Sequence, residues 1–301
     1  MDRHLVSVFF SFFSVFYPAV GWGETIRVAS YNVENYLVMD RMVSGRWQED
    51  YPKPLKERRI VRSVINQTNP DVLAIQEIGE RVYLDELWQD LNNTNGTQFK
   101  YCAWLPGFEE GEQRHLALLS KIPFTLVKNS PDLSFKYFEV RRSPSRGLLE
   151  AEFEIGGQKW TLFNLHLKSK WTERDDDPQA ADLREKEARV IRDYIRQIYP
   201  PETNPVHLVV GDFNDFKNTA PIRRFQKVNK TILHHMLPCQ DTMGYFWTHY
   251  YKKQDSYDRL DYLFASPSMF ENYIHGSARV NNSLRCLEGS DHRMVYADFE
   301  F

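Results

Sequence analysis

Residues 208–215 constrain the fold most, because an apolar run there leads directly into a carboxylate and an amide. The four residues LVVG predict a short buried strand, and Asp212 and Asn214 follow at its carboxyl end. In open α/β sheets ligands bind at that edge, since the loops converge there while core side chains fill the strand bodies. An ordinary strand followed by an Asx turn would have the same local sequence. The choice between a site and a turn therefore depends on how many similar strand ends the chain contains.

The rest of the chain predicts a mixture of helices and short strands. Apolar spacing near 3.6 residues and proline or asparagine stops predict helices at 55–69, 83–91 and 178–199, with 221–228 as a further candidate. Residues 41–54 are predicted as a polar loop, and residues 234–251 have no assignable pattern. Gly156-Gly157 joins two strands in a hairpin, which indicates antiparallel pairing. Strands are expected at 26–33, 71–76, 99–104, 116–120, 124–127, 146–155, 160–167, 260–265 and 294–301.

Polar residues of a few chemical types recur at or beside the ends of these strands. They are Asn32, Glu77, His166, Asp212, Asn214, Asp261, Asp291 and His292. Each alone has an ordinary explanation, such as a turn residue for Asn32, a helix charge for Glu77 or a core histidine for His166. Their recurrence at one kind of position is not explained in that way and predicts a shared site. Carboxylate and amide oxygens are hard ligands, so the site suits Mg²⁺ or Mn²⁺ and not zinc.

Six short motifs in order along the chain resemble those of the endonuclease/exonuclease/phosphatase superfamily. They are Tyr31-Asn32-Val33, Ile75-Gln76-Glu77, Asn164-Leu165-His166-Leu167, Gly211-Asp212-Phe213-Asn214, Arg259-Leu260-Asp261-Tyr262 and Ser290-Asp291-His292. The resemblance spans residues 26–300 and includes DNase I-like nucleases, abasic-site endonucleases, neutral sphingomyelinases and inositol polyphosphate 5-phosphatases. It implies an α/β fold, a four-layer α/β/β/α sandwich of two mixed, largely antiparallel sheets. It also implies hydrolysis of a phosphoester by water with a divalent metal, usually magnesium.

The resemblance implies a role for each motif residue, beginning with the metal. Glu77 is expected to bind Mg²⁺, or Mn²⁺, directly, and Asn32 and Asp291 to complete the site directly or through water. His292, oriented by Asp261, is expected to accept a proton from the attacking water or to stabilise charge on the pentavalent phosphorus.

The remaining motif residues are expected to act on the nucleophile and the phosphoryl group. Asp212 would position the nucleophile or assist the leaving oxygen, while Asn214 and His166 would hold phosphoryl oxygens. Arg146, at the start of a hairpin strand as in DNase I-like members, is a candidate phosphate contact, with an ordinary surface arginine as the alternative. Asp258 is a rival to Asp261 as the partner of a histidine.

The substrate is less constrained than the reaction. With 38 basic and 41 acidic residues the net charge is −3, so affinity for nucleic acid would require a local patch. Such a patch could be formed by Lys168, Lys170, Arg174, Arg141, Arg142 and Arg146, although solvated loop charges are the alternative. We expect an exported nuclease, a monomer acting on nucleic acid.

Two other functions remain open. A lipid or small-molecule phosphodiesterase or phosphatase could use the aromatic residues at 245–247 and 250–251 to dock on a membrane, although core packing explains them better. A non-catalytic binding module on the same fold would be marked by the loss of acidic or histidine positions, and none is lost.

Residues 1–23 have the composition of a secretory signal peptide, with Arg3, an apolar stretch and small residues at 19–21. A membrane anchor and a buried first strand are the alternatives, but the apolar stretch is short for a span. We therefore expect a secreted or periplasmic protein without stable membrane insertion after cleavage, folded as one domain over residues 24–301. Its three cysteines, Cys102, Cys239 and Cys286, allow at most one internal disulfide, whose pairing the sequence does not decide.

Overall fold

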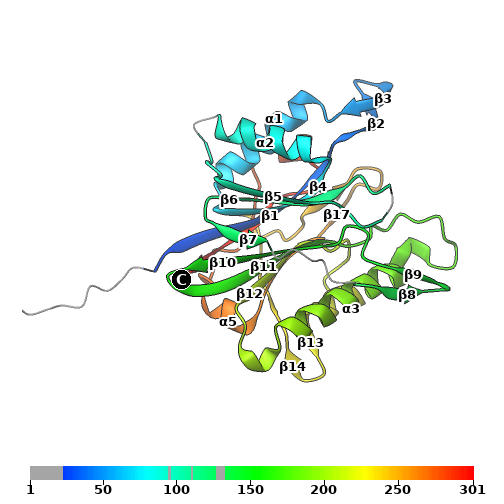
Figure 1. Cartoon of the computed structure of the whole chain (residues 1–301). Coiled ribbons are helices and arrows are strands. Elements are labelled where there is room, and N and C mark those ends of the chain that lie inside the picture. The colour runs from blue at the N-terminus through cyan, green and yellow to red at the C-terminus, as the bar shows by residue number, and fades with distance from the viewer. Residues whose placement is uncertain (1–22, 94–95, 110, 127–132) are drawn as a thin grey trace, which may run out of the picture.

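Two six-stranded sheets lie face to face with helices on their outer sides (Figure 1) in a computed structural model, which describes residues 23–93, 96–109, 111–126 and 133–301. This is the predicted four-layer sandwich of two mixed sheets. The predicted signal peptide lies outside the described residues, apart from Gly23, and stays a prediction. No helix in the described ranges is long and apolar enough to cross a membrane.

The first sheet is built mainly from the N-terminal half of the chain and from the last strand. Its order is β19 (Arg279–Val280), β20 (Val295–Glu300), β1 (Thr25–Tyr36), β4 (Val72–Ile78), β6 (His115–Ser120) and β5 (Tyr101–Leu105). The central pair β1–β4 is parallel, because helix α1 (Leu55–Thr68) crosses between these strands, and the other pairs are antiparallel. Helix α1 and helix α2 (Arg81–Asn92) cover the outer face of this sheet.

The second sheet repeats this arrangement with later segments. Its order is β15 (His235–Met236), β18 (Asp261–Ala265), β12 (His207–Asp212), β11 (Gln158–His166), β10 (Leu148–Ile155) and β7 (Phe124–Leu126). The pair β11–β12 is parallel, with helix α3 (Ala181–Ile198) as its crossover, and the other pairs are antiparallel. Helix α3 and the short helix α4 (Ala220–Gln226) cover its outer face.

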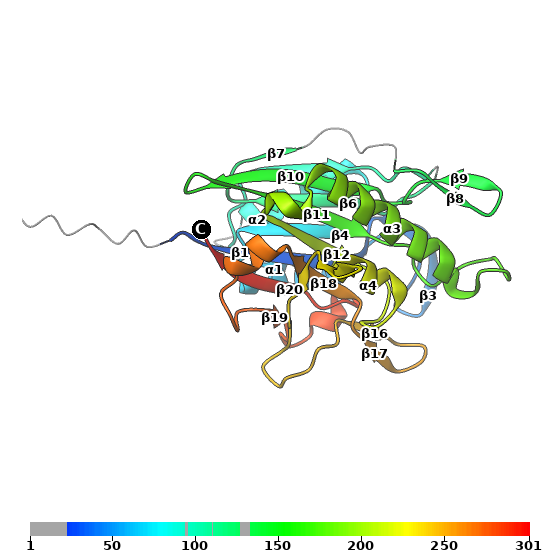
Figure 2. The same cartoon turned by 90° about the horizontal axis from the view of Figure 1, so that it is seen from below.

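Small hairpins and short helices extend from the sandwich. The hairpins are β2 (Val38–Val43) with β3 (Arg46–Pro52), β8 (Phe135–Tyr137) with β9 (Val140–Arg142), β13 (Lys227–Val228) with β14 (Thr231–Ile232), and β16 (His249–Tyr251) with β17 (Ser256–Asp258). The short helices are α5 (Pro267–Glu271) and the 3₁₀ turns Pro178–Ala180, Pro201–Thr203 and Cys286–Glu288. The β8–β9 hairpin lies beside α3 in both views (Figures 1 and 2).

The prediction of a loop at 41–54 is wrong, since β2 and β3 form a hairpin there and α1 begins at Leu55. Its turn at Ser44 and Gly45 has positive φ at both residues, which is the usual two-residue hairpin geometry. The residues of both strands are half-buried or exposed on both faces, so the sequence lacks the alternation of apolar and polar residues that predicts a strand. The candidate helix at 221–228 is shorter than predicted, since α4 ends at Gln226 and Lys227–Val228 pairs with β14 as a strand.

The apolar strands are long hydrophobic runs because both of their faces are covered. In β12, Leu208 and Val210 belong to the core between the two sheets, whereas Val209 packs in the layer under α3. Each such fully buried side chain contributes about 1.5–3 kcal/mol relative to exposure. The alternation along β12 also fixes which way its last residue, Asp212, points.

Replacing Gly211 by alanine is expected to lower the free energy of unfolding by about 3 kcal/mol or more, the cost of forcing atoms into a packed interior. Gly211 has φ 141°, and a Cβ there would lie 1.9 Å from the carbonyl oxygen of Leu165 in β11. Gly157→Ala is a matched control, because its φ is 84° but no atom lies within 4 Å. It should cost only about 1–2 kcal/mol from the backbone conformation. Equal losses for the two variants in urea unfolding would contradict the steric explanation.

Candidate active site

The polar residues predicted at strand ends meet at one edge of the two sheets, around Asp212. Its Oδ2 accepts a hydrogen bond from Nδ2 of Asn32 at 3.0 Å. The same oxygen lies 3.5 Å from Nε2 of His166 and 3.7 Å from Nε2 of His292. Asn32 belongs to the first sheet and Asp212 to the second, so the centre spans both sheets. Asn32, His166, Asp212 and His292 are all buried.

Glu77 reaches this centre through an irregularity in β4. It is the extra residue between Gln76 and Ile78, which pair with consecutive residues of β6, and its φ is 62°. Such a bulge turns a side chain out of the normal alternation and is frequent beside active sites. The carboxylate consequently accepts hydrogen bonds from Nδ2 of Asn32 at 3.1 Å and from the backbone N–H of Asn35 at 2.8 Å.

His292 is oriented by Asp261, with 2.8 Å between Nδ1 and Oδ2. Asp261 begins β18 opposite Asp212, and its backbone N–H donates to Oγ1 of Thr248. Asp258, the other candidate partner for a histidine, lies in β17, where its backbone is opposite that of His249 in β16. His292 therefore presents Nε2 to Asp212 while Nδ1 bonds to a buried carboxylate.

The other predicted residues lie around this centre in less direct ways. Asn214, with φ 51°, donates from Nδ2 to the carbonyl of Leu167 at 3.0 Å, and its backbone N–H donates to Oδ1 of Asp212 at 2.8 Å. Asp291 is partly exposed, with Oδ1 4.0 Å from Nε2 of His292. Arg146 is only 6% exposed, so its interpretation as an ordinary surface arginine is wrong.

Three residues near the site were not predicted. Glu34 accepts a hydrogen bond from the backbone N–H of Asp291 at 3.0 Å, and His249 places Nε2 3.6 Å from Oδ2 of Asp291. Arg114 lies with Nε 3.9 Å from Glu77 Oε2. Glu34 follows Asn32 by two residues, a spacing like that of Asp212 and Asn214, and that signal could have identified it. His249 lies in a segment without a recognisable pattern.

The charges at the centre strongly influence each other. Burial raises the pKa of Asp212 to about 7, with the charges of Asp261 and Glu77 adding to the effect and that of His292 opposing it. Burial disfavours a charged His292, yet Asp261 and Asp212 raise its pKa well above the ordinary value. Burial alone would raise the pKa of Glu77, but Arg114 and a hydrogen bond hold it below its ordinary value. These shifts favour the ionised form of Glu77 and the protonated form of His292.

The donor set fits a divalent cation with a preference for oxygen ligands. Burial, followed by the charge of Asp291, raises the pKa of Glu34 to about 7, so two acids of this cluster resist ionisation in the absence of a neutralising charge. Donor atoms lie within 4.8 Å of one another in two groups, Asp212 with Asp261 and His292, and His249 with Asp291 and His292. Both groups include His292, whereas Glu77, the predicted direct ligand, belongs to neither. The carboxylates of Glu34, Glu77, Asp212 and Asp291 are oxygen donors of the kind that suits Mg²⁺ or Mn²⁺.

A groove of about 680 Å³ opens over this centre. Its walls carry acidic, basic and aromatic side chains together with Glu77, His166, Asp212, Asn214, Asp291 and His292. The basic and aromatic ones are Arg114, Arg142, Arg146, Lys168, Arg174, Tyr137 and Trp171. Arg141 and Lys170, two members of the predicted basic patch, are not among the residues that line it.

Comparison with known proteins assigns the chain to a family. The sequence profile of the Endonuclease/Exonuclease/phosphatase family matches residues 29–292, and the chain belongs to this family. Members are mostly phosphoesterases and typically use divalent metals. A comparison with curated proteins found no match.

Solved structures share the fold. TDP2 from Caenorhabditis elegans is 20% identical with a TM-score of 0.61, over 92% of this chain and 98% of that one. The beta toxin 275-280 from Staphylococcus aureus is 14% identical with a TM-score of 0.61, over 90% and 99%. The human Nocturnin catalytic domain with bound sulfate anion is 15% identical with a TM-score of 0.56, over 92% and 94%. At these identities the likeness concerns the fold alone.

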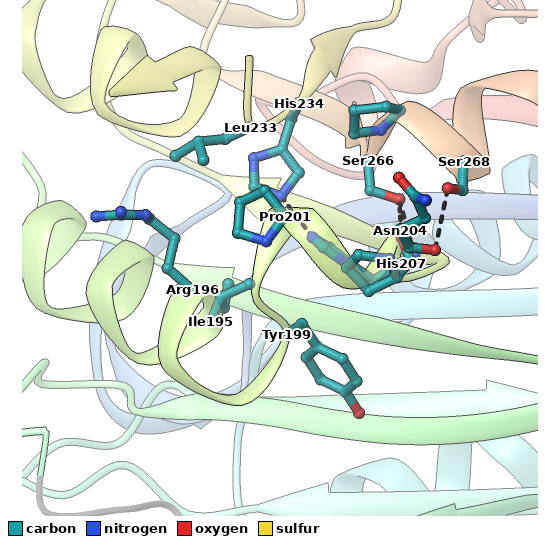
Figure 3. Close-up of a pocket in the computed structure, with 12 residues that line it drawn as sticks. Ile195, Arg196, Tyr199, Pro201, Asn204, His207, Leu233, His234, Ser266 and Ser268 are labelled. Atoms are coloured by element: carbon teal, nitrogen blue, oxygen red, sulfur yellow. Dashed lines mark hydrogen bonds between the residues drawn. The ribbon is translucent and has the colours of Figure 1, made fainter. Parts of the chain in front are cut away.

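A small cavity of about 20 Å³ lies at the opposite end of β12 from the site (Figure 3). There Nε2 of His207 and Nε2 of His234 face each other at 2.8 Å, and both rings are buried. Nδ1 of His234 donates to the carbonyl of Phe225, so its Nε2 accepts and His207 donates. Burial lowers the pKa of His234 to about 4 and that of His207 well below its ordinary value.

This histidine pair predicts a loss of stability in acid. Unfolded histidine binds a proton below pH of about 6.5, whereas buried neutral His234 does not until about pH 4. Stability is therefore lost as pH falls between these values, by roughly 3 kcal/mol for His234. His234→Gln should flatten this dependence in urea unfolding at several pH values, whereas His275→Gln, at an exposed position, should not. An unchanged slope in His234→Gln would refute the assignment.

Proposed function

We propose that this protein is a divalent-metal-dependent phosphodiester hydrolase and that it acts as an exported nuclease. The observation that carries the proposal is the convergence of Asn32, His166 and His292 on one oxygen of Asp212 inside an open groove. Glu77 would hold Mg²⁺, with Asn32 and Asp291 completing the site. The bound ion would supply a Lewis acid for the phosphoryl oxygens.

The side chains can divide the remaining chemistry among them. Asp212, whose pKa lies at about 7, is suited to orient the attacking water and receive its proton. Of the two roles predicted for His292, its raised pKa favours stabilisation of negative charge on the phosphoryl group over acceptance of a proton. Buried neutral His166 and the amide of Asn214 would position the phosphoryl oxygens. Asp261 keeps the His292 ring in place.

The proposal of export is supported by the sequence of residues 1–23, and the proposal of action on nucleic acid by the side chains of the groove. The composition of residues 1–23 supports secretion or transfer to a periplasm. Two cations of the groove lie beside aromatic rings that also line it, Lys168 near Trp171 and Arg174 near Tyr137, a combination suited to phosphates and bases. A monomer is the proposed state.

A second candidate, a lipid phosphodiesterase, is favoured by a specific surface. Met243, Tyr245, Phe246, Tyr257 and Leu284 are all more than 45% exposed, and all but Phe246 line one open hollow of mainly apolar character. The interpretation of Tyr245 and Phe246 as core residues is therefore wrong, because they lie on an irregular segment outside both sheets. Such a surface could contact lipid.

One experiment separates these functions. The mature protein with Mg²⁺ is incubated with plasmid DNA, RNA, sphingomyelin and bis-p-nitrophenyl phosphate, and the products are quantified. We expect cleavage of nucleic acid and of the aryl diester. Preferential cleavage of sphingomyelin would support the lipid candidate instead. Cleavage of none of them, with bound metal confirmed, would refute the proposal and favour a binding module.

A further inference from the structure

The β2–β3 hairpin projects from the sandwich (Figure 1), although its strands bury little apolar surface. Met42 and Trp47 are 62% and 59% exposed, whereas Lys53, directly after β3, is only 1% exposed. A lysine is almost never fully buried unless its charge is paired. Nζ of Lys53 lies 3.4 Å from Oε2 of Glu57 and 3.8 Å from Oε2 of Glu34. The burial of Lys53 therefore marks a specific contact between the hairpin and the rest of the protein.

Lys53 and Arg41 of the hairpin region bind backbone carbonyls at and just after the end of β1. Nζ of Lys53 donates to the carbonyl of Glu34 at 2.7 Å. Nη2 of Arg41 donates to the carbonyls of Asn35 and Leu37 at 3.2 Å and 2.8 Å. Hydrogen bonds from cationic donors are stronger than neutral ones and directional. The two cations therefore fix the position of this part of the backbone.

This part of the backbone has a conformation that needs support. Glu34 and Asn35 have φ angles of 44° and 49°, both in the left-handed region that residues with a side chain seldom adopt in succession. The pairing of β1 with β4 is irregular at the same point. Strained residues of this kind persist where surrounding contacts hold them, and they cluster at ligand sites. The contacts from Lys53 and Arg41 supply such support.

The two strained residues also contact each of the three residues proposed to hold the metal ion. The backbone N–H of Glu34 donates to Oδ1 of Asn32 at 2.9 Å. The backbone N–H of Asn35 donates to Oε2 of Glu77 at 2.8 Å. Oε2 of Glu34 accepts from the backbone N–H of Asp291 at 3.0 Å. A shift of this short segment would therefore displace all three residues.

We propose that the β2–β3 hairpin sets the affinity of the metal site, with Lys53 and Arg41 as positioning residues that act through Glu34 and Asn35. This inference rests on the proposed metal-dependent function and adds two residues to it that no sequence motif indicated. Groups that orient metal ligands without touching the ion typically change metal affinity by about 10–100-fold when they are replaced. The hairpin is thus expected to matter for metal binding although it lies outside both sheets.

Replacing Lys53 by methionine tests this directly, because a side chain of similar length loses its charge and its donor. The carboxylates of Glu34 and Glu57 are 38% and 36% exposed and stay hydrated, so the variant should fold. Calorimetric titration with Mn²⁺ should give a Kd about 10-fold higher than that of the wild type, or more. The Mg²⁺ concentration for half-maximal hydrolysis of bis-p-nitrophenyl phosphate should rise similarly, while kcat at saturating Mg²⁺ stays within about threefold.

A purely structural role of Lys53 would lower the melting temperature but leave the Kd of the folded protein unchanged. Lys56→Met is the matched control, since Lys56 is 69% exposed and pairs with Glu288 at the surface. Its Kd for Mn²⁺ should equal that of the wild type. If Lys53→Met does not fold, Arg41→Met takes its place, and Arg41→Lys, which keeps a donor, should recover part of the affinity. Arg46→Met, at an exposed position of the same hairpin, is then the control.

The titration does not depend on turnover, so it separates this inference from the proposed function. Weaker Mn²⁺ binding by Lys53→Met but not by Lys56→Met supports the inference even if the protein hydrolyses no diester. An unchanged Kd in folded Lys53→Met, or an equal increase in Lys56→Met, overturns it even if the wild type cleaves nucleic acid. A wild-type protein that binds no Mn²⁺ overturns it as well.

Discussion

Replacing His292 by alanine is expected to lower kcat for phosphodiester hydrolysis by about 10³-fold or more, with the fold intact. Nε2 of His292 lies 3.7 Å from Oδ2 of Asp212, and the ring is fixed by the 2.8 Å hydrogen bond to Asp261. Alanine removes the group that would stabilise charge on the phosphoryl oxygens. Initial rates on bis-p-nitrophenyl phosphate measure the effect, and circular dichroism checks folding.

A companion variant tests whether Asp261 acts through His292. Asp261→Asn keeps the shape of the side chain but removes the charge that raises the pKa of His292. Its pH–rate profile should change shape, which a purely structural defect would not produce. A folded His292→Ala protein with more than a tenth of wild-type activity would remove His292 from the mechanism.

Replacing Glu77 by glutamine is the second change with a large expected effect. It should lower kcat by about 10³-fold and raise the Mg²⁺ concentration needed for half-maximal activity, because a carboxylate ligand becomes a weaker neutral one. Excess EDTA should abolish turnover of the wild-type protein. Calorimetric titration with Mn²⁺ should show a matching loss of affinity in Glu77→Gln without reference to activity.

Glu80→Gln is the matched control for this change. Its side chain is 72% exposed three residues further along the chain, so metal affinity and rate should stay near those of the wild type. Full activity of the wild-type protein in excess EDTA would contradict the metal requirement. Unchanged Mn²⁺ affinity in Glu77→Gln would move the ligand role to other carboxylates of the centre.

Local sequence predicted the sheets well where both faces of a strand are buried. Residues 208–211 fall in β12, and the acid and amide that follow lie at its carboxyl edge, because an apolar run ending in polar residues has few other placements. The hairpin β2–β3 was missed since its strands bury little apolar surface. A local pattern of apolar residues cannot predict strands that bury little apolar surface.

The candidate site was predictable in its residue types but not in its geometry. The strand ends indicated Asp212 and His292, yet the bulge that turns Glu77 inward depends on how β4 pairs with two neighbours. The groove wall that contains Arg146 likewise depends on Glu187 of α3, which accepts hydrogen bonds from the backbone N–H groups of Ser145 and Lys168, and these residues are far apart in the sequence. Glu34 and His249 join the site through non-local contacts with Asp291. The roles assigned to all these residues stay predictions.

The hydrogen bond from Asn32 to Asp212 joins strands of two different sheets, whose mutual alignment is maintained by the apolar layer between them. Apolar side chains of this layer, such as Val28, Leu162 and Val210, therefore set the distance between the two halves of the centre. A sliding of one sheet over the other by a fraction of an ångström would misplace reacting groups long before the chain unfolds. Catalytic rate should thus be a more sensitive gauge of inter-sheet alignment than melting temperature.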